Sequence, residues 1–234
     1  IFGVMEHRLF LNRIAECTAQ FTPVVDAVYA ASDYQFLDLS TTNEILTEVD
    51  TSSSDAIQLY INTFLAKTGG LVAYGGYLEK RSIYDRSLYF NNDNPELKRN
   101  IHLGLDVWVP AGTAILAPVA GTVHSFKDNT NYGDYGPCIV LEHRFEDFHF
   151  YTLYGHLSRA SLSALTEGQK ISAGQTFAHL GTSEENGDYG PHLHFQIIKD
   201  MQEFKGDYPG VSTHKNLDFY KNNCPDPNLL LKIT

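Results

Sequence analysis

Two segments near the N-terminus show the spacing of apolar side chains that is typical of amphipathic helices. The first covers residues 5–20, and the second has the sequence SSDAIQLYINTFLAKTGG. Five apolar residues of the second recur at intervals of three and four, which places them on one helix face: Ile57, Tyr60, Ile61, Phe64 and Leu65. Ser54 or Asp55 is the expected N-cap, and the Gly69-Gly70 pair is the expected end. We therefore predict a helical cap region over residues 1–70.

From about residue 71 the pattern changes to short β-type runs separated by Gly, Pro, Asn and Asp, such as TAILAPVAGTVHSF, CIVLEHR and PHLHFQIIK. No helical spacing separates these runs, so the pattern favours an antiparallel sandwich or barrel. We predict a mainly β fold with one β domain over residues 71–200. Residues 201–234 are predicted to form an irregular tail, with a final strand after Pro225 and Pro227.

The composition is that of an ordinary folded domain and disfavours several kinds of partner. Of the 234 residues, 43% are hydrophobic and 19% are charged, so a chain of this length has the material for a core. The net charge of −11 provides no basic surface for nucleic acid. No run reaches the roughly 18 apolar residues of a membrane span, and no signal peptide is visible. The sequence as given therefore predicts a cytoplasmic location, and Met5 is the expected start of translation.

Histidine and aspartate side chains, and not cysteines, form the candidate chemical site. The chain has an odd number of widely spaced cysteines, which favours neither a disulfide framework nor a Cys-type zinc site. In NIHLGLDVWVP, a bend at Gly104 would bring His102 and Asp106 together as two zinc ligands. In GPHLHFQII, His192 and His194 share one face of a strand. One of them would complete a three-ligand site, and the other would stand beside the open position as an acid or base.

His156, in LYGHLSRAS, is a further candidate at the end of an aromatic strand. At such a position it could orient a water molecule or stabilise an oxyanion. The motifs HLGLD, YGHLS and GPHLHFQ occur in this order, together with VPAGTAILAPVAGTV and EGQKISAGQTFAHLG. With these motifs the chain resembles the lysostaphin/LytM-type zinc endopeptidases over about residues 71–200.

The resemblance implies a fold, a cofactor and a division of roles. The implied fold is an antiparallel β barrel-sandwich of the duplicated hybrid motif kind, with one zinc ion per chain. His102, Asp106 and His194 would ligate the zinc, while His156 and His192 would act on the bound water and the transition state. The implied reaction is hydrolysis of peptide bonds by a zinc metallo-endopeptidase, usually in the stem peptides or cross-bridges of bacterial peptidoglycan. Proteins of this family usually act in the cell envelope or outside the cell.

Two other functions are compatible with parts of the pattern. A catalytically silent module of the same fold would bind zinc or peptide as a regulator, although such modules usually lack a ligand and none is missing here. A biotinyl or lipoyl carrier would need a lysine flanked by methionines, and Met5 and Met201 lie elsewhere. Four further histidines in strand-like runs are expected to be structural, with His143 as a candidate partner behind the ligands: His124, His143, His149 and His179.

Overall fold

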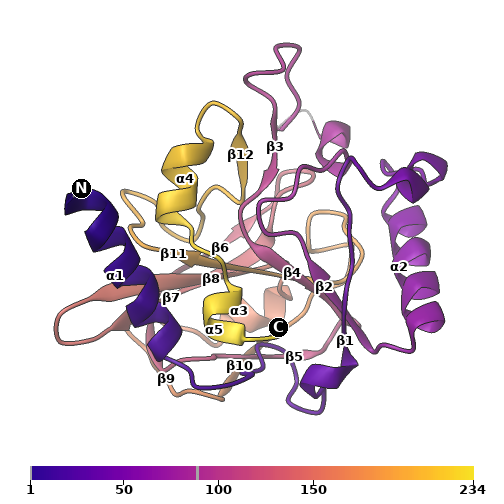
Figure 1. Cartoon of the computed structure of the whole chain (residues 1–234). Helices are drawn as coiled ribbons and strands as arrows, with labels where there is room; N and C mark the ends of the chain where they lie inside the picture. The colour runs from indigo at the N-terminus through magenta and orange to yellow at the C-terminus, as the bar shows by residue number, and fades with distance from the viewer. Residues whose placement is uncertain (1, 88–89) are drawn as a thin grey trace.

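The helices lie mainly near the two ends of the chain, and strands fill its middle (Figure 1). The computed structural model describes residues 2–87 and 90–234, and it confirms the expected mainly β fold with helices near the N-terminus. The α-helices are α1 (Phe2–Glu16), α2 (Ser54–Thr68), α3 (Arg159–Ser163), α4 (Leu217–Asn223) and α5 (Asn228–Leu231). The 3₁₀-helices are η1 (Ala31–Asp33), η2 (Glu44–Glu48) and η3 (Ile83–Arg86). Within the described ranges no helix combines the length and the apolar character needed to cross a bilayer.

Eight strands form one large sheet, in the order β1-β2-β4-β11-β8-β7-β6-β9. Its strands are β1 (Tyr34–Phe36), β2 (Val72–Gly75), β4 (Leu105–Trp108), β6 (Gly121–Asn129), β7 (Gly136–Arg144), β8 (His149–Gly155), β9 (Lys170–Ile171) and β11 (Leu193–Ile198). Only the β1-β2 pair is parallel among these neighbours. Two separate pairs join β5 (Ala114–Leu116) to β10 (Thr176–His179) and β3 (Arg99–His102) to β12 (Val211–Thr213).

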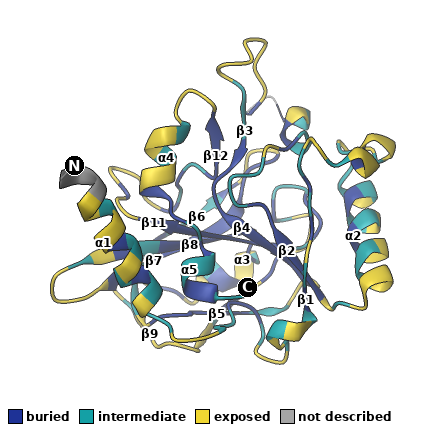
Figure 2. Cartoon of the chain, in the orientation of Figure 1, coloured by how far each residue is buried: buried dark blue, intermediate teal, exposed yellow. Residues whose placement is uncertain are grey.

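Strand β11 lies inside the large sheet, between β4 and β8, and every one of its residues is buried (Figure 2). Successive side chains of a strand point to opposite faces. Leu193, Phe195 and Ile197 therefore pack in the largest hydrophobic cluster. Ile198 packs in a second cluster, and His194 and Gln196 share its face of the sheet. This alternation places polar side chains in the interior of the molecule.

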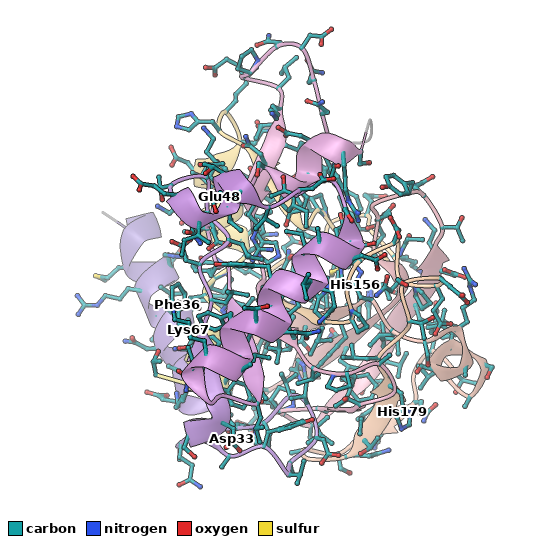
Figure 3. The ribbon with its side chains drawn as sticks, turned by 90° about the vertical axis from the view of Figure 1, so that its right-hand side faces the viewer. Asp33, Phe36, Glu48, Lys67, His156 and His179 are labelled. Atoms are coloured by element: carbon teal, nitrogen blue, oxygen red, sulfur yellow. The ribbon has the colours of Figure 1, made fainter. Side chains whose placement is uncertain are left out.

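Helix α2 confirms the second predicted helix and covers one side of the molecule (Figure 3). Its N-cap is Ser53, one residue before the expected position, because the Ser53 side chain accepts a hydrogen bond from the backbone N–H of Ala56. The helix ends at Gly69, which has a φ of 74°. Buried Ile57 and Ile61 pack in a cluster with Trp108 of β4, so the helix faces the sheet next to β11.

The C-terminal tail differs from the expectation. Its strand is β12, and the residues after Pro227 form helix α5, so the predicted final strand is wrong. Pro227 has a φ of −58°, a value that suits the start of a helix. Leu230 and Leu231 of this helix are buried in the largest cluster, so apolar burial fixes the chain end as a helical turn.

Candidate functional site

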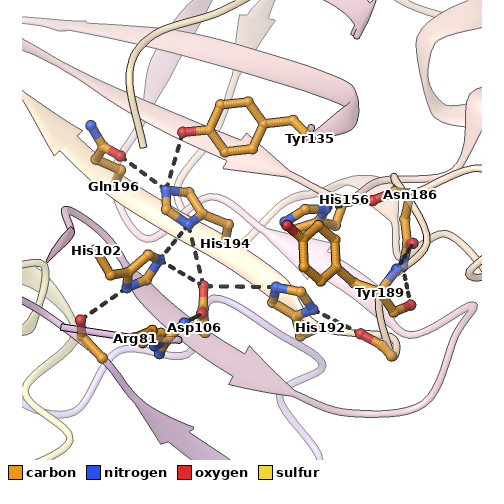
Figure 4. Close-up of polar contacts among 12 residues, drawn as sticks. Arg81, His102, Asp106, Tyr135, His156, Asn186, Tyr189, His192, His194 and Gln196 are labelled. Atoms are coloured by element: carbon orange, nitrogen blue, oxygen red, sulfur yellow. Dashed lines mark hydrogen bonds and ion pairs between the residues drawn. The ribbon is translucent and has the colours of Figure 1, made fainter. Parts of the chain in front are cut away.

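Three of the predicted residues meet at the centre of the large sheet (Figure 4). His194 on β11 pairs directly with Asp106 on β4, and His102 reaches the same point from the end of β3. His102 Nε2 lies 2.8 Å from His194 Nδ1, and each of these nitrogens lies 3.2 Å from Asp106 Oδ1. All three side chains are buried, and together they form a group that can hold a metal ion.

Hydrogen bonds on the far side of each imidazole determine where its proton lies. His102 Nδ1 is 2.9 Å from the carbonyl oxygen of Gly76. His194 Nε2 is 2.9 Å from the amide oxygen of Gln196. Both oxygens only accept hydrogen bonds, so each of these ring nitrogens donates. Nε2 of His102 and Nδ1 of His194 are therefore left with lone pairs directed into the site.

The centre of the site is consequently rich in electron pairs and fits a cation. Asp106 Oδ1 is buried and has no hydrogen-bond partner among the residues that the structure describes. Burial lowers the pKa of His102 to about 4, so this ring is neutral near pH 7. Burial opposes ionisation of Asp106, yet His102 and Arg81 hold the pKa of its carboxyl well below the usual value. Two imidazoles and a carboxylate are a donor set that zinc prefers. A metal ion would relieve the close approach of their lone pairs.

Two further histidines line the same space. His192 Nδ1 donates to the carbonyl oxygen of Gly190 at 2.8 Å, and His156 Nδ1 donates to that of Asn186 at 2.7 Å. Burial lowers the pKa of both imidazoles, so that each is neutral near pH 7 with an unprotonated Nε2. The two rings lie 4.3 Å apart, and His192 Nε2 is 3.9 Å from Asp106 Oδ1. This arrangement offers two proton acceptors beside the candidate metal position.

Aromatic rings hold these two histidines in place. Trp108 stacks on His192 with ring centres 5.6 Å apart. Tyr189 packs edge-on against His156 at 5.1 Å. His156 also has a φ of 63°, a left-handed backbone conformation that is strained for a residue with a side chain. Such strain persists only where the surrounding structure enforces it. Here it lies directly after the end of β8, where the ring of His156 packs against the ring of His192.

Two hollows open on the cluster. The larger has a volume of about 270 Å³, and His102, His156 and His194 form part of its wall. Most of its other large side chains are aromatic: Tyr84, Phe90, Tyr135, Tyr189, Phe204 and Tyr208. The smaller hollow, of about 40 Å³, touches all five candidate residues and also Leu39 and Ile57. Because Ile57 lies on α2, the N-terminal helical region contributes directly to the walls of the site.

The sequence motifs identified the five side chains that meet here, but they missed the side chains behind them. Gln196 could have been found from the sequence, because its spacing of two residues from His194 places both side chains on the same face of the strand. Arg81 carried no such signal, because it contacts Asp106 across 25 residues of sequence and belongs to no motif.

His143 has the expected structural role. Its Nδ1 lies 2.9 Å from the carbonyl oxygen of Ala120, and its Nε2 lies 2.7 Å from the hydroxyl of Thr152. The alternative, that His143 supports the ligands, is therefore wrong. The three cysteines are free thiols, and the last two are buried: Cys17, Cys138 and Cys224.

Comparison with known proteins agrees with the geometry of the site. Residues 100–206 match the sequence profile of peptidase family M23. This segment, just under half of the chain, is therefore similar to peptidase family M23. An uncharacterized metalloprotease of Haemophilus influenzae is 35% identical to this chain over 96 residues, which are 41% of this chain and 18% of that protein. The chain thus spans less than a fifth of this relative. The resemblance to lysostaphin-type peptidases that the motifs indicated is confirmed.

Two solved catalytic domains are similar to about half of this chain. A mutant catalytic domain of the prophage-encoded M23 protein EnpA from Enterococcus faecalis is 27% identical, covering 51% of this chain and 86% of that chain with a TM-score of 0.36. The catalytic domain of the antimicrobial peptidase lysostaphin from Staphylococcus simulans is 22% identical, covering 52% and 80% with a TM-score of 0.36. Both TM-scores are below 0.5, so the similarity to family M23 rests on the sequence match.

Proposed function

We propose that this chain is a zinc metallo-endopeptidase that hydrolyses peptide bonds in the stem peptides or cross-bridges of bacterial peptidoglycan. The observation that carries the proposal is the convergence of His102, Asp106 and His194 on one buried point, with two further neutral histidines beside it. The M23 match supports a peptidase, and the similarity to lysostaphin supports the substrate class.

The proposal includes the architecture. We assign the β strands of residues 71–200 to a barrel-sandwich of the duplicated hybrid motif kind. Residues 1–70 are then an N-terminal helical cap region, whose strand β1 extends the large sheet, and residues 201–234 are a C-terminal tail. The contacts of Leu39 and Ile57 with the smaller hollow support a cap that lies against the site.

In this proposal His102 Nε2, Asp106 Oδ1 and His194 Nδ1 hold one zinc ion. Zinc, when bound, supplies Lewis acidity, which polarises a carbonyl group and makes water acidic enough to attack near neutral pH. Gly76 and Gln196 accept hydrogen bonds from the outer nitrogens of the two histidines. These bonds fix the tautomers and the ring orientations in which the inner nitrogens can ligate.

His192 and His156 supply the proton chemistry. Each is anchored through its Nδ1–H, so each presents Nε2 to the reacting groups. One Nε2 takes the proton of the attacking water, and the resulting imidazolium then gives a proton to the leaving amine. The second neutral imidazole accepts a hydrogen bond at Nε2 and thereby orients the attacking water.

Separating metal binding from turnover tests these roles. We expect about one zinc per chain in the wild type, and loss of both zinc and hydrolysis in His194→Ala. His192→Ala and His156→Ala should keep zinc while turnover falls by roughly 10²- to 10⁴-fold. His149→Ala is the control, because His149 is an exposed histidine at the far end of β8. A wild-type protein that binds no zinc would contradict the proposal.

A catalytically silent peptide-binding module is the second candidate, and the larger, aromatic-lined hollow beside the cluster favours it. The five candidate residues are all buried, with at most 6% of any one exposed. Mass spectrometry of products from purified peptidoglycan, and from synthetic Gly-Gly and D-Ala peptides, distinguishes the two functions. Release of fragments supports the endopeptidase, whereas a zinc-loaded protein that releases none from any substrate supports the silent module.

A further inference from the structure

Arg81 is a buried cation in direct contact with a proposed metal ligand, and it lies outside the segment that matches family M23. Only 3% of the residue is exposed. Its Nη1 donates to Asp106 Oδ2, the carboxylate oxygen that faces away from His102 and His194 (Figure 4). The oxygen that remains, Oδ1, is the one directed between the two imidazoles. The contact with Arg81 therefore fixes which oxygen of Asp106 is available to a metal.

A second carboxylate holds the guanidinium from the opposite side. Arg81 Nε donates to Glu79 Oε2, and the other oxygen of Glu79 accepts the backbone N–H of Leu39 at 3.0 Å. The side chains of Glu79 and Arg81 are 7% and 4% exposed. A buried chain of polar contacts thus runs from the backbone of Leu39 through Glu79 and Arg81 to Asp106.

The local backbone leaves room for this arrangement. A Cβ atom on Gly76 would lie 1.9 Å from Arg81 Nη2 and 2.9 Å from His102 Nδ1. Gly76 has a φ of 101°, which also favours glycine. The guanidinium further lies over the ring of Trp108, with its central carbon 5.7 Å from the ring centre. The orientation of the Arg81 guanidinium is therefore fixed by Asp106, Glu79 and the ring of Trp108.

We propose that Arg81 is a positioning residue for the metal centre: by holding Oδ2 of Asp106 it directs Oδ1 towards the metal, and Glu79 holds Arg81 in turn. This inference rests on the proposed metal site. Under this proposal, residues 37–81, which precede the M23 segment, contribute to the affinity of the site for metal.

Two physical effects of Arg81 on metal binding have opposite signs, which makes the inference testable. Coulomb repulsion between the guanidinium and a divalent cation weakens binding, so a role as a simple charge predicts tighter binding when Arg81 is removed. A positioning role predicts weaker binding, because Asp106 loses its fixed orientation. Loss of a partner behind a metal ligand typically costs 10- to 100-fold in affinity.

The test uses the full chain and measures zinc affinity by competition with a chromophoric chelator, together with the visible absorption spectrum of the Co²⁺-substituted protein. We expect Arg81→Met to bind zinc about 10- to 100-fold more weakly and to show an altered Co²⁺ spectrum. Arg81→Lys keeps the charge without the planar two-sided bridge, so it should recover only part of the affinity. Arg86→Met is the matched control, because Arg86 is also a buried arginine but pairs with Asp188.

Should Arg81→Met fail to fold, the double variant Glu79→Gln/Arg81→Met removes the buried acid together with its partner and takes its place. Zinc affinity equal to or above that of the wild type, with an unchanged Co²⁺ spectrum, would overturn the positioning role while leaving the metal site intact. A wild-type chain that binds neither metal would instead overturn the proposed function.

Discussion

Replacing Gly104 with alanine would place a methyl group against the ring of His194. A Cβ atom at Gly104 would lie 2.6 Å from Cε1 and Nε2 of His194, and 2.8 Å from the carbonyl oxygen of Phe195. Ordinary van der Waals contact begins at 3.4 Å, so the ring would have to retreat by about 0.8 Å. The backbone of Phe195 cannot retreat as easily, because β11 is paired on both sides.

A shift of this size is large for a metal ligand. A displacement of about 1 Å in an active site can cost about 10²-fold in rate, and disturbed ligand orientation typically costs 10- to 100-fold in metal affinity. We therefore expect Gly104→Ala to bind zinc about 10- to 100-fold more weakly than the wild type in chelator competition. Peptide hydrolysis should fall in parallel when zinc is limiting.

The control for Gly104→Ala is Gly112→Ala. Gly112 has a φ of 81°, and no atom of the described residues lies within 4 Å of the place where a Cβ would be. Alanine at this position therefore strains the backbone without contacting the site. It should cost about 1–2 kcal/mol of stability and leave zinc affinity unchanged. If Gly104→Ala bound zinc as tightly as the wild type, the space at Gly104 would not determine the position of His194 and the reasoning would be wrong.

Two further predictions concern stability. Removing zinc with a chelator should lower the melting temperature by about 5–10 °C, since a ligand at 100 times its Kd contributes about 2.7 kcal/mol and each kcal/mol corresponds to about 2–4 °C at this size; an unchanged melting temperature would argue against a metal site. Burial lowers the pKa of His143 to about 4, so the unfolded chain, with an ordinary pKa near 6.5, binds a proton that the folded chain does not. Because of this difference, His143 makes the free energy of unfolding about 3 kcal/mol larger above pH 6.5 than at pH 4. This stability is lost as the pH falls from 6.5 towards 4. Urea unfolding at pH 7 and pH 4.5 should therefore show a smaller acid-induced loss in His143→Gln than in the wild type, and equal losses would contradict the assignment.

The periodic parts of the fold could be predicted from local sequence. Helix α2 has a regular apolar stripe and a glycine at its end, so its position was predicted to within a few residues. The helical turn of α5 was missed because three leucines after two prolines suit a strand or a helix equally well. Only the burial of Leu230 and Leu231 against the largest cluster distinguishes the two.

The five candidate site residues could be predicted because they lie in short motifs, whereas the contacts behind them depend on the fold. Gly104 was expected to supply a bend between His102 and Asp106. Its φ is not in the left-handed region, and the structure instead shows that glycine is needed to leave space for His194. Arg81 and Glu79 reach Asp106 only after β2 has paired with β4, so no local pattern could reveal them.

The position of His194 in the sheet links metal binding to correct folding. On β11 this residue lies opposite Asp106 of β4 and opposite Gly155 of β8. A slip of one residue along β11 would reverse the two faces of the strand. It would set Leu193 or Phe195 beside the carboxylate and turn His194 into the largest apolar cluster. A chain with misaligned strands would therefore lack the proposed zinc site, so that metal binding would report on the correct alignment of the sheet.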